Sequence, residues 1–196
     1  MTEDSLSLVR RLLEFWFGAL GDPERGSLRK AWFEKDLDFD AAVRAQFHDF
    51  VLEAGRGRLD NLSGTADGVL ALILLLNQFP RNIFRGEAQS YAYDAKARAV
   101  ARLALGMGLD KVLSPVERIF IYLPFEHSED LDDQIRSVAL FKTLPPVSWR
   151  DEAIDYAIRH HDIIVRFGRF PHRNAVLGRA STAEELAFLQ EPDSSS

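Results

Sequence analysis

Three stretches of the sequence place charged and hydrogen-bonding side chains beside a proline, directly after an apolar segment. They are Gln78–Gly86, Leu123–Asp130 and Arg166–Asn174. A histidine beside a carboxylate, as at Glu126 and His127, can take up and release a proton near neutral pH. The forked donors of arginine can hold a carboxylate or a phosphate. We therefore predict that the three stretches converge on one polar pocket.

The residue types in this pocket divide into two roles. For acid/base catalysis, His127 or His172 would transfer the proton and Glu126 would orient the histidine. The predicted ligand-binding residues carry amide or guanidinium groups: Gln78, Arg81, Asn82, Arg85, Arg166, Arg169, Arg173 and Asn174. The favoured ligand is a small anion or an acidic peptide terminus, and the alternative is an enzyme with hydrolase-like chemistry.

A third hypothesis gives the same residues a purely structural or partner-docking role. Acidic and basic groups occur in blocks of similar size, so they can pair with one another and lock helix ends together. The candidate acids are Glu126, Glu129 and Asp130, and the candidate bases are Arg81, Arg169 and Arg173. Removing one member of such a buried pair would cost about 3–5 kcal/mol.

The sequence argues against a metal or another cofactor. It contains no cysteine, which excludes disulfides, thiolate catalysis and cysteine zinc sites. Histidines and carboxylates are present, but no His-Glu-x-x-His motif occurs. The adjacent His160 and His161 would point about 100° apart on a helix, so we expect a half-buried surface position rather than a shared site. We predict no metal and no cofactor.

The net charge of -6 argues against a protein that binds nucleic acid by neutralising phosphates. The acidic start of the chain, Met1–Asp4, does not resemble a signal peptide. We expect a cytoplasmic protein that binds a small ligand or a protein or peptide partner, and neither nucleic acid nor membrane. The sequence makes no prediction of the oligomeric state.

An unbroken apolar run, Val69–Leu76, directly precedes the first polar stretch in the sequence and should form the helix that positions it. A helix without a polar face is buried on all sides, and this one is too short to cross a bilayer. Pro80 lacks an amide hydrogen and clashes with the preceding turn, so we expect the helix to kink or stop near Phe79.

The remaining elements also have helical spacing. Ser114 and Pro115 begin a helix that Pro124 should stop; Ser128 should cap the next one. That helix should turn five apolar residues inward: Leu131, Ile135, Val138, Ala139 and Phe141. Ser181 and Glu184 have the spacing of a capping box. We predict an all-α fold of stacked antiparallel helical hairpins, with one domain over residues 1–190 and a disordered tail over 191–196.

The three stretches also resemble a known family. The runs Gln78–Asn82, Leu123–Asp130 and Arg166–Asn174 resemble the bacterial "domain of unknown function 924" family, and the similarity extends from about Leu13 to Leu189. Asn77 stands where the family pattern has an acidic residue. The resemblance implies a tetratricopeptide-repeat-like helical fold, and it implies no established biochemical function.

Overall fold

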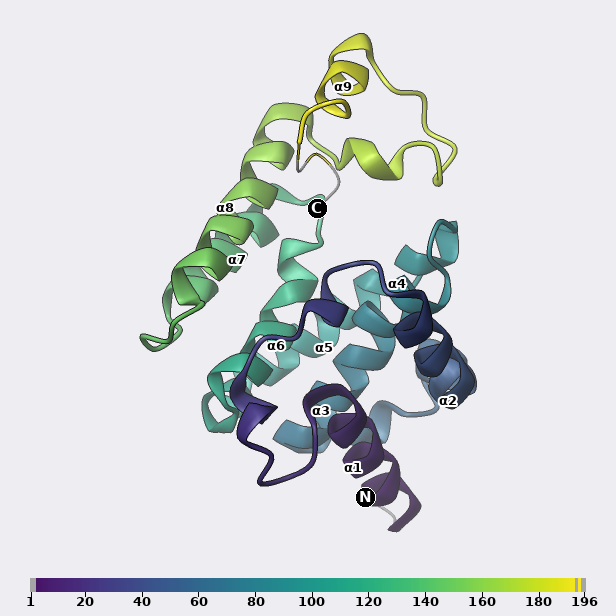
Figure 1. Cartoon of the computed structure of the whole chain (residues 1–196), viewed down its shortest axis with the longest axis vertical. Helices are drawn as coiled ribbons and strands as arrows, with labels where there is room; N and C mark the ends of the chain where they lie inside the picture. The colour runs from purple at the N-terminus through teal and green to yellow at the C-terminus, as the bar shows by residue number, and fades with distance from the viewer. Residues whose placement is uncertain (1–2, 193, 195–196) are drawn as a thin grey trace. The chain divides into compact units, whose positions relative to one another are not determined.

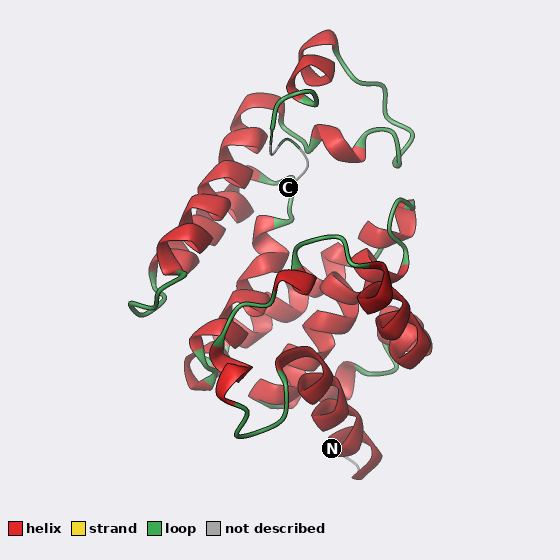
Figure 2. Ribbon diagram, in the orientation of Figure 1, coloured by secondary structure: helices red, strands yellow, loops and turns green. Residues whose placement is uncertain are grey.

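The computed structural model describes residues 3–192 and residue 194. Within these residues the chain forms helices and loops and no strand (Figure 2), which confirms the all-α prediction. Part of the predicted tail, residues 193, 195 and 196, lies outside the described residues. No helix of the described part has the length and apolar content needed to span a membrane.

The helices group into two compact units, each of which is described by itself. The described residues of Met1–Arg85 and Gln89–Pro124 form unit 1, and those of Gly86–Ala88 and Phe125–Ser196 form unit 2. The α-helices of unit 1 are α1 Glu3–Phe17, α2 Leu37–Gly55, α3 Ala66–Ile73, α4 Phe79–Ile83, α5 Asp94–Gly106 and most of α6 Pro115–Glu126 (Figure 1). Unit 2 contains the end of α6 with α7 Leu131–Lys142, α8 Arg150–Phe167 and α9 Ala183–Phe188.

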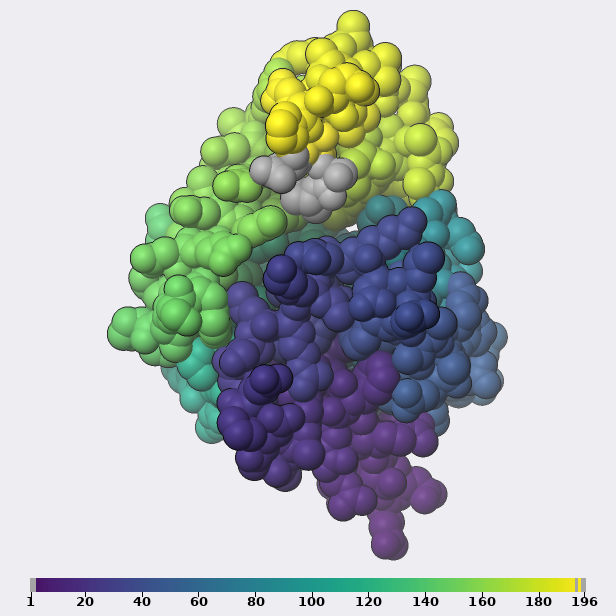
Figure 3. Space-filling model, viewed as in Figure 1, coloured from purple at the N-terminus to yellow at the C-terminus, as the bar shows by residue number. Residues whose placement is uncertain are grey.

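Short helical turns connect these helices. In unit 1 they are η1 Pro23–Gly26, η2 Lys30–Trp32, η3 Asp60–Gly64 and η6 Leu109–Val112, and unit 2 has η7 Pro171–Arg173. A further turn, η5 Ala88–Tyr91, precedes α5. In Figure 3 the segment from α1 to η2, in purple to dark blue, covers part of the visible face of unit 1.

The apolar run is the centre of unit 1, as predicted. Every residue from Val69 to Leu76 has no exposed surface. Large aromatic side chains pack around it, with the ring centroids of Trp16 and Phe79 5.2 Å apart and those of Trp32 and Phe120 5.1 Å apart. Such contacts bury a large apolar area and stabilise the unit through the hydrophobic effect.

Of the two outcomes predicted near Phe79, a kink or a stop, the stop does not occur. The chain continues from α3 through a π-helical turn, η4 Leu74–Gln78, into α4, which has Pro80 in its first turn. Proline fits the first turn of a helix because its missing amide hydrogen would have no intrahelical acceptor there. The wider π-turn thus lets the helical path pass the proline without ending.

Unit 2 is built on the hairpin of α7 and α8, which pack side by side (Figure 1). Its apolar contacts include Phe141 from α7 and Ile163 and Ile164 from α8, with Phe170 packed on the latter two. Gly168 ends α8 in the left-handed conformation, with φ of 66°, which glycine adopts without strain. The wider arrangement as stacked, tetratricopeptide-repeat-like hairpins stays a prediction.

Two helix boundaries in unit 2 differ from expectation. Helix α6 continues past Pro124 to Glu126, because a proline in the last turn removes only one hydrogen bond of the helix. Helix α7 is capped by Asp130 rather than Ser128: the Asp130 carboxylate accepts hydrogen bonds from the amides of Asp132 and Asp133. The Ser128 hydroxyl instead accepts from the Asp130 amide and donates to the Asp133 carboxylate.

Candidate functional site

The last residue of α6 places a carboxyl group in the interior of unit 2. Glu126 is 4% exposed, and its Oε1 lies 3.5 Å from Nδ1 of His160 on α8, which is equally buried. Oε2 of Glu126 is buried and has no hydrogen-bond partner among the described residues. Burial raises the pKa of Glu126 to about 8, because the ionised form loses its hydration. This carboxyl group is therefore mostly protonated at neutral pH.

A hydrogen bond to the backbone orients the His160 ring. Nδ1 lies 2.9 Å from the backbone carbonyl oxygen of Tyr156, one helical turn earlier. A carbonyl oxygen can only accept, so Nδ1 donates in this contact, and Nε2 is the nitrogen that can take up a further proton. The structure thus corrects the expectation of a half-buried surface histidine at position 160. His161, in contrast, is only half-buried, and its Nδ1 lies 2.9 Å from the neighbouring Asp162 carboxylate.

Further aromatic and basic side chains lie next to the Glu126–His160 pair. The Phe170 ring lies 5.6 Å from the rings of both His160 and His172, and the His127 ring lies 6.3 Å from that of His160. The buried Arg173 guanidinium lies 4.3 Å from the centre of the Phe170 ring, a favourable cation–π distance. We call Glu126, His127, His160, His172 and Arg173, with Phe170, the acid/base cluster.

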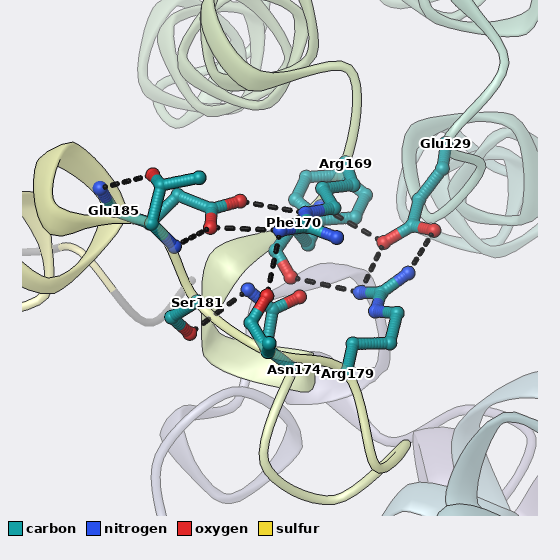
Figure 4. A network of polar contacts seen from close by, with 9 residues as sticks. Glu129, Arg169, Phe170, Asn174, Arg179, Ser181 and Glu185 are labelled. Carbon is teal, nitrogen blue, oxygen red and sulfur yellow. Dashed lines mark hydrogen bonds and ion pairs between the residues drawn. The ribbon is translucent and has the colours of Figure 1, made fainter.

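An ion pair holds the segment that carries Phe170. Arg179 donates to both oxygens of Glu129, at 2.7 and 2.9 Å, and the Phe170 amide donates to the same carboxylate at 2.8 Å (Figure 4). Burial alone would raise the pKa of Glu129, but these hydrogen bonds hold it below its usual range. The turn before α7 is thereby joined to the segment after α8.

A second pair lies on the other side of Phe170 in Figure 4. Arg169 donates to both oxygens of Glu185, at 2.6 and 2.8 Å. The Arg169 bonds, followed by one from the Thr182 amide, lower the pKa of Glu185 to about 2. The capping box of α9 is formed by Thr182 and Glu185, one residue later than predicted. Ser181 instead accepts a hydrogen bond from Asn174 at 3.0 Å.

Arg166 stands apart from the cluster. Its guanidinium pairs with Glu184 at 2.9 Å, and the two side chains are 45% and 63% exposed. The same group lies 4.6 Å from the centre of the Phe167 ring. These contacts give Arg166 a role at the surface of α8 and α9, where an ion pair contributes little to stability.

The first polar stretch forms its own network in unit 1. Arg81 makes a two-pronged ion pair with Asp94 of α5, at 2.8 and 2.9 Å. Asn77 donates to the same carboxylate at 3.0 Å and accepts from Gln78 at 3.1 Å. Asp94 thus places a carboxylate next to Asn77, the position at which the family pattern has an acid.

Asp40 of α2 binds the remaining two predicted residues of this stretch, Asn82 and Arg85. Arg85 donates to both of its oxygens, at 2.7 and 2.9 Å, and Asn82 donates at 2.7 Å. Burial would raise the pKa of Asp40, but the bonds from Arg85 and Asn82 hold it below its usual range. Neither Asp40 nor Asp94 was among the predicted site residues, because both lie outside the three polar stretches.

The predicted site residues therefore fall into two groups. Unit 2 brings together Glu126, His127, His172 and Arg173, with Arg169 and Asn174 beside them and Arg166 at the surface. Unit 1 holds Gln78, Arg81, Asn82 and Arg85. The convergence of all three stretches on one pocket stays a prediction. His160 was not among the predicted site residues, because its burial shows only in the folded structure.

The predicted site residues of the described part coincide with neither a cluster of metal ligands nor the surface hollow beside Lys30. Within the residues that the structure describes, no three histidine, aspartate or glutamate side chains are placed to hold a metal ion. A shallow surface hollow in unit 1 is lined by Lys30, Ala31, Glu34, Lys35, Asp36, Leu37 and Asp38. None of the predicted site residues lines it.

The chain is thus an all-α protein with charged helix ends and a buried carboxyl–histidine pair. The chain belongs to the family described as bacterial protein of unknown function (DUF924), whose model matches residues 12–193. A solved structure of a protein of unknown function from Agrobacterium tumefaciens is similar, with 41% sequence identity and a TM-score of 0.84. The similarity covers 95% of this chain and 99% of that one. A comparison with curated proteins gives no match.

Proposed function

We propose that the acid/base cluster of unit 2 is the active centre of an enzyme that hydrolyses a small anionic substrate. The observation that carries the proposal is the Glu126–His160 pair. A buried carboxyl group with a pKa of about 8 lies 3.5 Å from a buried imidazole. Titratable groups with strongly shifted pKa values are typical of catalytic sites, because catalysis needs groups that exchange protons near the working pH.

The two groups are suited to complementary steps of a hydrolysis. The protonated carboxyl of Glu126 donates its hydrogen to the leaving group as the bond to that group breaks. Nε2 of His160 accepts the hydrogen that water loses as its oxygen attacks. Nε2 then releases its proton to water and the Glu126 carboxylate takes one up from water, so both groups return to their starting forms. His127 and His172, which are half-buried, extend this proton-transfer system.

The charges of the cluster favour an anionic substrate. Neutral Glu126 adds no negative charge at pH below its pKa, whereas Arg173 adds a permanent positive one. Arg173 is buried 4.3 Å from the centre of the Phe170 ring, and its charge would attract an anionic substrate to the cluster. The arginines Arg81, Arg85 and Arg169 are paired with carboxylates of the chain itself.

The test is a turnover screen with small phosphate, sulfate and carboxylate esters. Wild type should hydrolyse at least one probe, and Glu126→Gln should lower kcat by about 100-fold or more, the usual effect of losing a general acid. Arg173→Met should raise KM for anionic probes. Glu152→Gln, which alters an exposed glutamate of α8, is the matched control. No turnover by wild type, or equal turnover by Glu126→Gln, contradicts the proposal.

A second candidate function is structural, and the ion pairs of both units favour it. Asp94, Asp40, Glu129 and Glu185 each take a two-pronged hydrogen bond from an arginine of the polar stretches or the segment following them. Such pairs fix helix ends without any ligand. The ion pairs would then stabilise a module that docks to a protein partner. Variants of Asp94 and Arg81 measure how much such a pair contributes to the free energy of unfolding.

A further inference from the structure

Helix α7 turns polar residues inward, against the amphipathic prediction. Gln134 and Ser137 have no exposed surface, whereas Leu131 and Ile135 are 45% and 52% exposed. Ala139 is also exposed and Val138 is half-buried, so of the five predicted residues only Phe141 is buried. Burying an amide in place of an apolar side chain costs free energy unless the amide is hydrogen-bonded. The bonds of Gln134 therefore need an explanation.

The Gln134 side chain binds the end of α6. Its Nε2 donates to the backbone oxygens of Glu126 and Ser128, each at 2.6 Å. An amide nitrogen has two hydrogens, so these two bonds use both. Arg173 donates to the intervening carbonyl, that of His127, at 2.9 Å. Three consecutive carbonyls, at positions 126–128, thus accept hydrogen bonds from buried side chains.

These bonds replace the usual end of a helix. The last carbonyls of a helix have no intrahelical partner and are commonly satisfied by a following glycine turn. Here the chain continues as His127-Ser128-Glu129 without a glycine, and Gln134 supplies the donors from the next helix. The backbone that carries Glu126 and His127 is held from outside its own helix.

We propose that Gln134 is a positioning residue of the acid/base cluster. By fixing the backbone on both sides of His127, it sets the direction in which the Glu126 side chain leaves α6 and keeps its Oε1 beside His160. This inference rests on the proposed function. Gln134 itself touches backbone and takes no part in proton transfer.

The test compares Gln134→Met with Ser137→Ala. Methionine keeps the length of the side chain and removes both donors, while Ser137 lies one turn further along the same buried face and its Oγ has no partner among the described residues. The readout is the titration of the Glu126 carboxyl carbon by NMR, with Glu126→Gln for assignment, alongside thermal melts. We expect Gln134→Met to lower the pKa of Glu126 by about 1 or more as water reaches the freed carboxyl. Ser137→Ala should leave it unchanged.

The outcomes separate this inference from the proposed function. A Gln134→Met protein that melts earlier but titrates like wild type overturns the inference, because it leaves Gln134 only a structural role. If wild-type Glu126 itself titrates near its ordinary value, both the proposed function and the inference fail. Should Gln134→Met not fold, Gln134→Asn, which stays uncharged and withdraws the donors by one methylene group, is titrated instead with the same expectation.

Discussion

Glu126 is both a member of a polar stretch, which the sequence shows, and a buried neighbour of His160, which it does not. Its place in the Leu123–Asp130 stretch identified it as a candidate acid/base residue. Its burial and its neighbour were not readable, because His160 lies 34 positions further along the chain, on another helix. The sequence predicts that Glu126 orients His127 or His172, whereas the structure places its carboxyl beside His160.

Glu185 gives a prediction at the scale of one residue. Its folded pKa, about 2, lies below the ordinary value of 4.5, so its stabilising effect is present above pH 4.5 and is lost as pH falls toward 2. Glu185→Gln should therefore lower the free energy of unfolding near neutral pH. The difference from wild type should shrink as the medium is acidified, and urea denaturation over this range measures it.

Glu184→Gln is the control for this experiment. Glu184 pairs with Arg166 at the surface, with side chains 63% and 45% exposed. Solvent screens such a pair, so its removal should change stability less than removal of the Glu185 charge. A larger effect of Glu184→Gln would show that the network in Figure 4 does not hold the segment after α8.

At the scale of elements, the proline-containing turns show what local sequence can and cannot predict. The Phe-Pro pairs of the first and third stretches both begin a short helical turn, α4 and η7, because proline suits the first turn of a helix. That similarity was visible in the sequence. The π-turn before Pro80 was not, since it depends on Leu74–Gln78 being buried by the surrounding helices.

The ion pair between Arg81 and Asp94 joins this turn to α5. Their side chains are 19% and 9% exposed, so each charge relies on the other for compensation. We predict that Asp94→Asn alone destabilises the protein by about 3 kcal/mol, because it leaves a poorly hydrated arginine unpaired. Arg81→Met alone should have a similar effect, measured by urea denaturation.

The double variant supplies the control. With both charges removed, no uncompensated charge remains, so Arg81→Met/Asp94→Asn should be less destabilised than the sum of the single variants. Additive effects would contradict a direct pair. They would also weaken the structural reading of the first polar stretch, because the stretch would then hold α5 by other contacts.

At the scale of the whole molecule, apolar spacing and proline positions were sufficient to predict an all-α chain. The three polar stretches were sufficient to indicate its family, because they are long and include several polar residues in fixed order. The division into two compact units was not predicted. One of its boundaries falls within α6, after Pro124, where the sequence predicts the end of a helix but no boundary between units.

Which residues of α7 face inward was also missed. Apolar periodicity favoured Leu131 and Ile135, and the structure buries Gln134 and Ser137 instead. Periodicity assumes that a buried face is apolar. Here the buried face has to supply donors to the end of α6, a demand that arises only when the two helices are packed.

The pH dependence of the free energy of unfolding, compared between wild type and Glu126→Gln, tests the central claim most directly. The pKa of Glu126 rises from 4.5 in the unfolded chain to about 8 in the fold, so the folded state holds the proton more tightly. The resulting stabilisation is complete below pH 4.5 and is lost as pH rises to about 8, at a slope near 1.4 kcal/mol per pH unit. Glutamine mimics the protonated carboxyl at every pH.

The two proteins should therefore be similarly stable near pH 4.5, and Glu126→Gln should be the more stable one above pH 8. Glu152→Gln, at an exposed position of α8, should follow wild type throughout. Parallel curves for wild type and Glu126→Gln would show that folding leaves the pKa of Glu126 unchanged, and a variant that is less stable above pH 8 would show that the ionised carboxylate stabilises the fold. Either result would contradict the account.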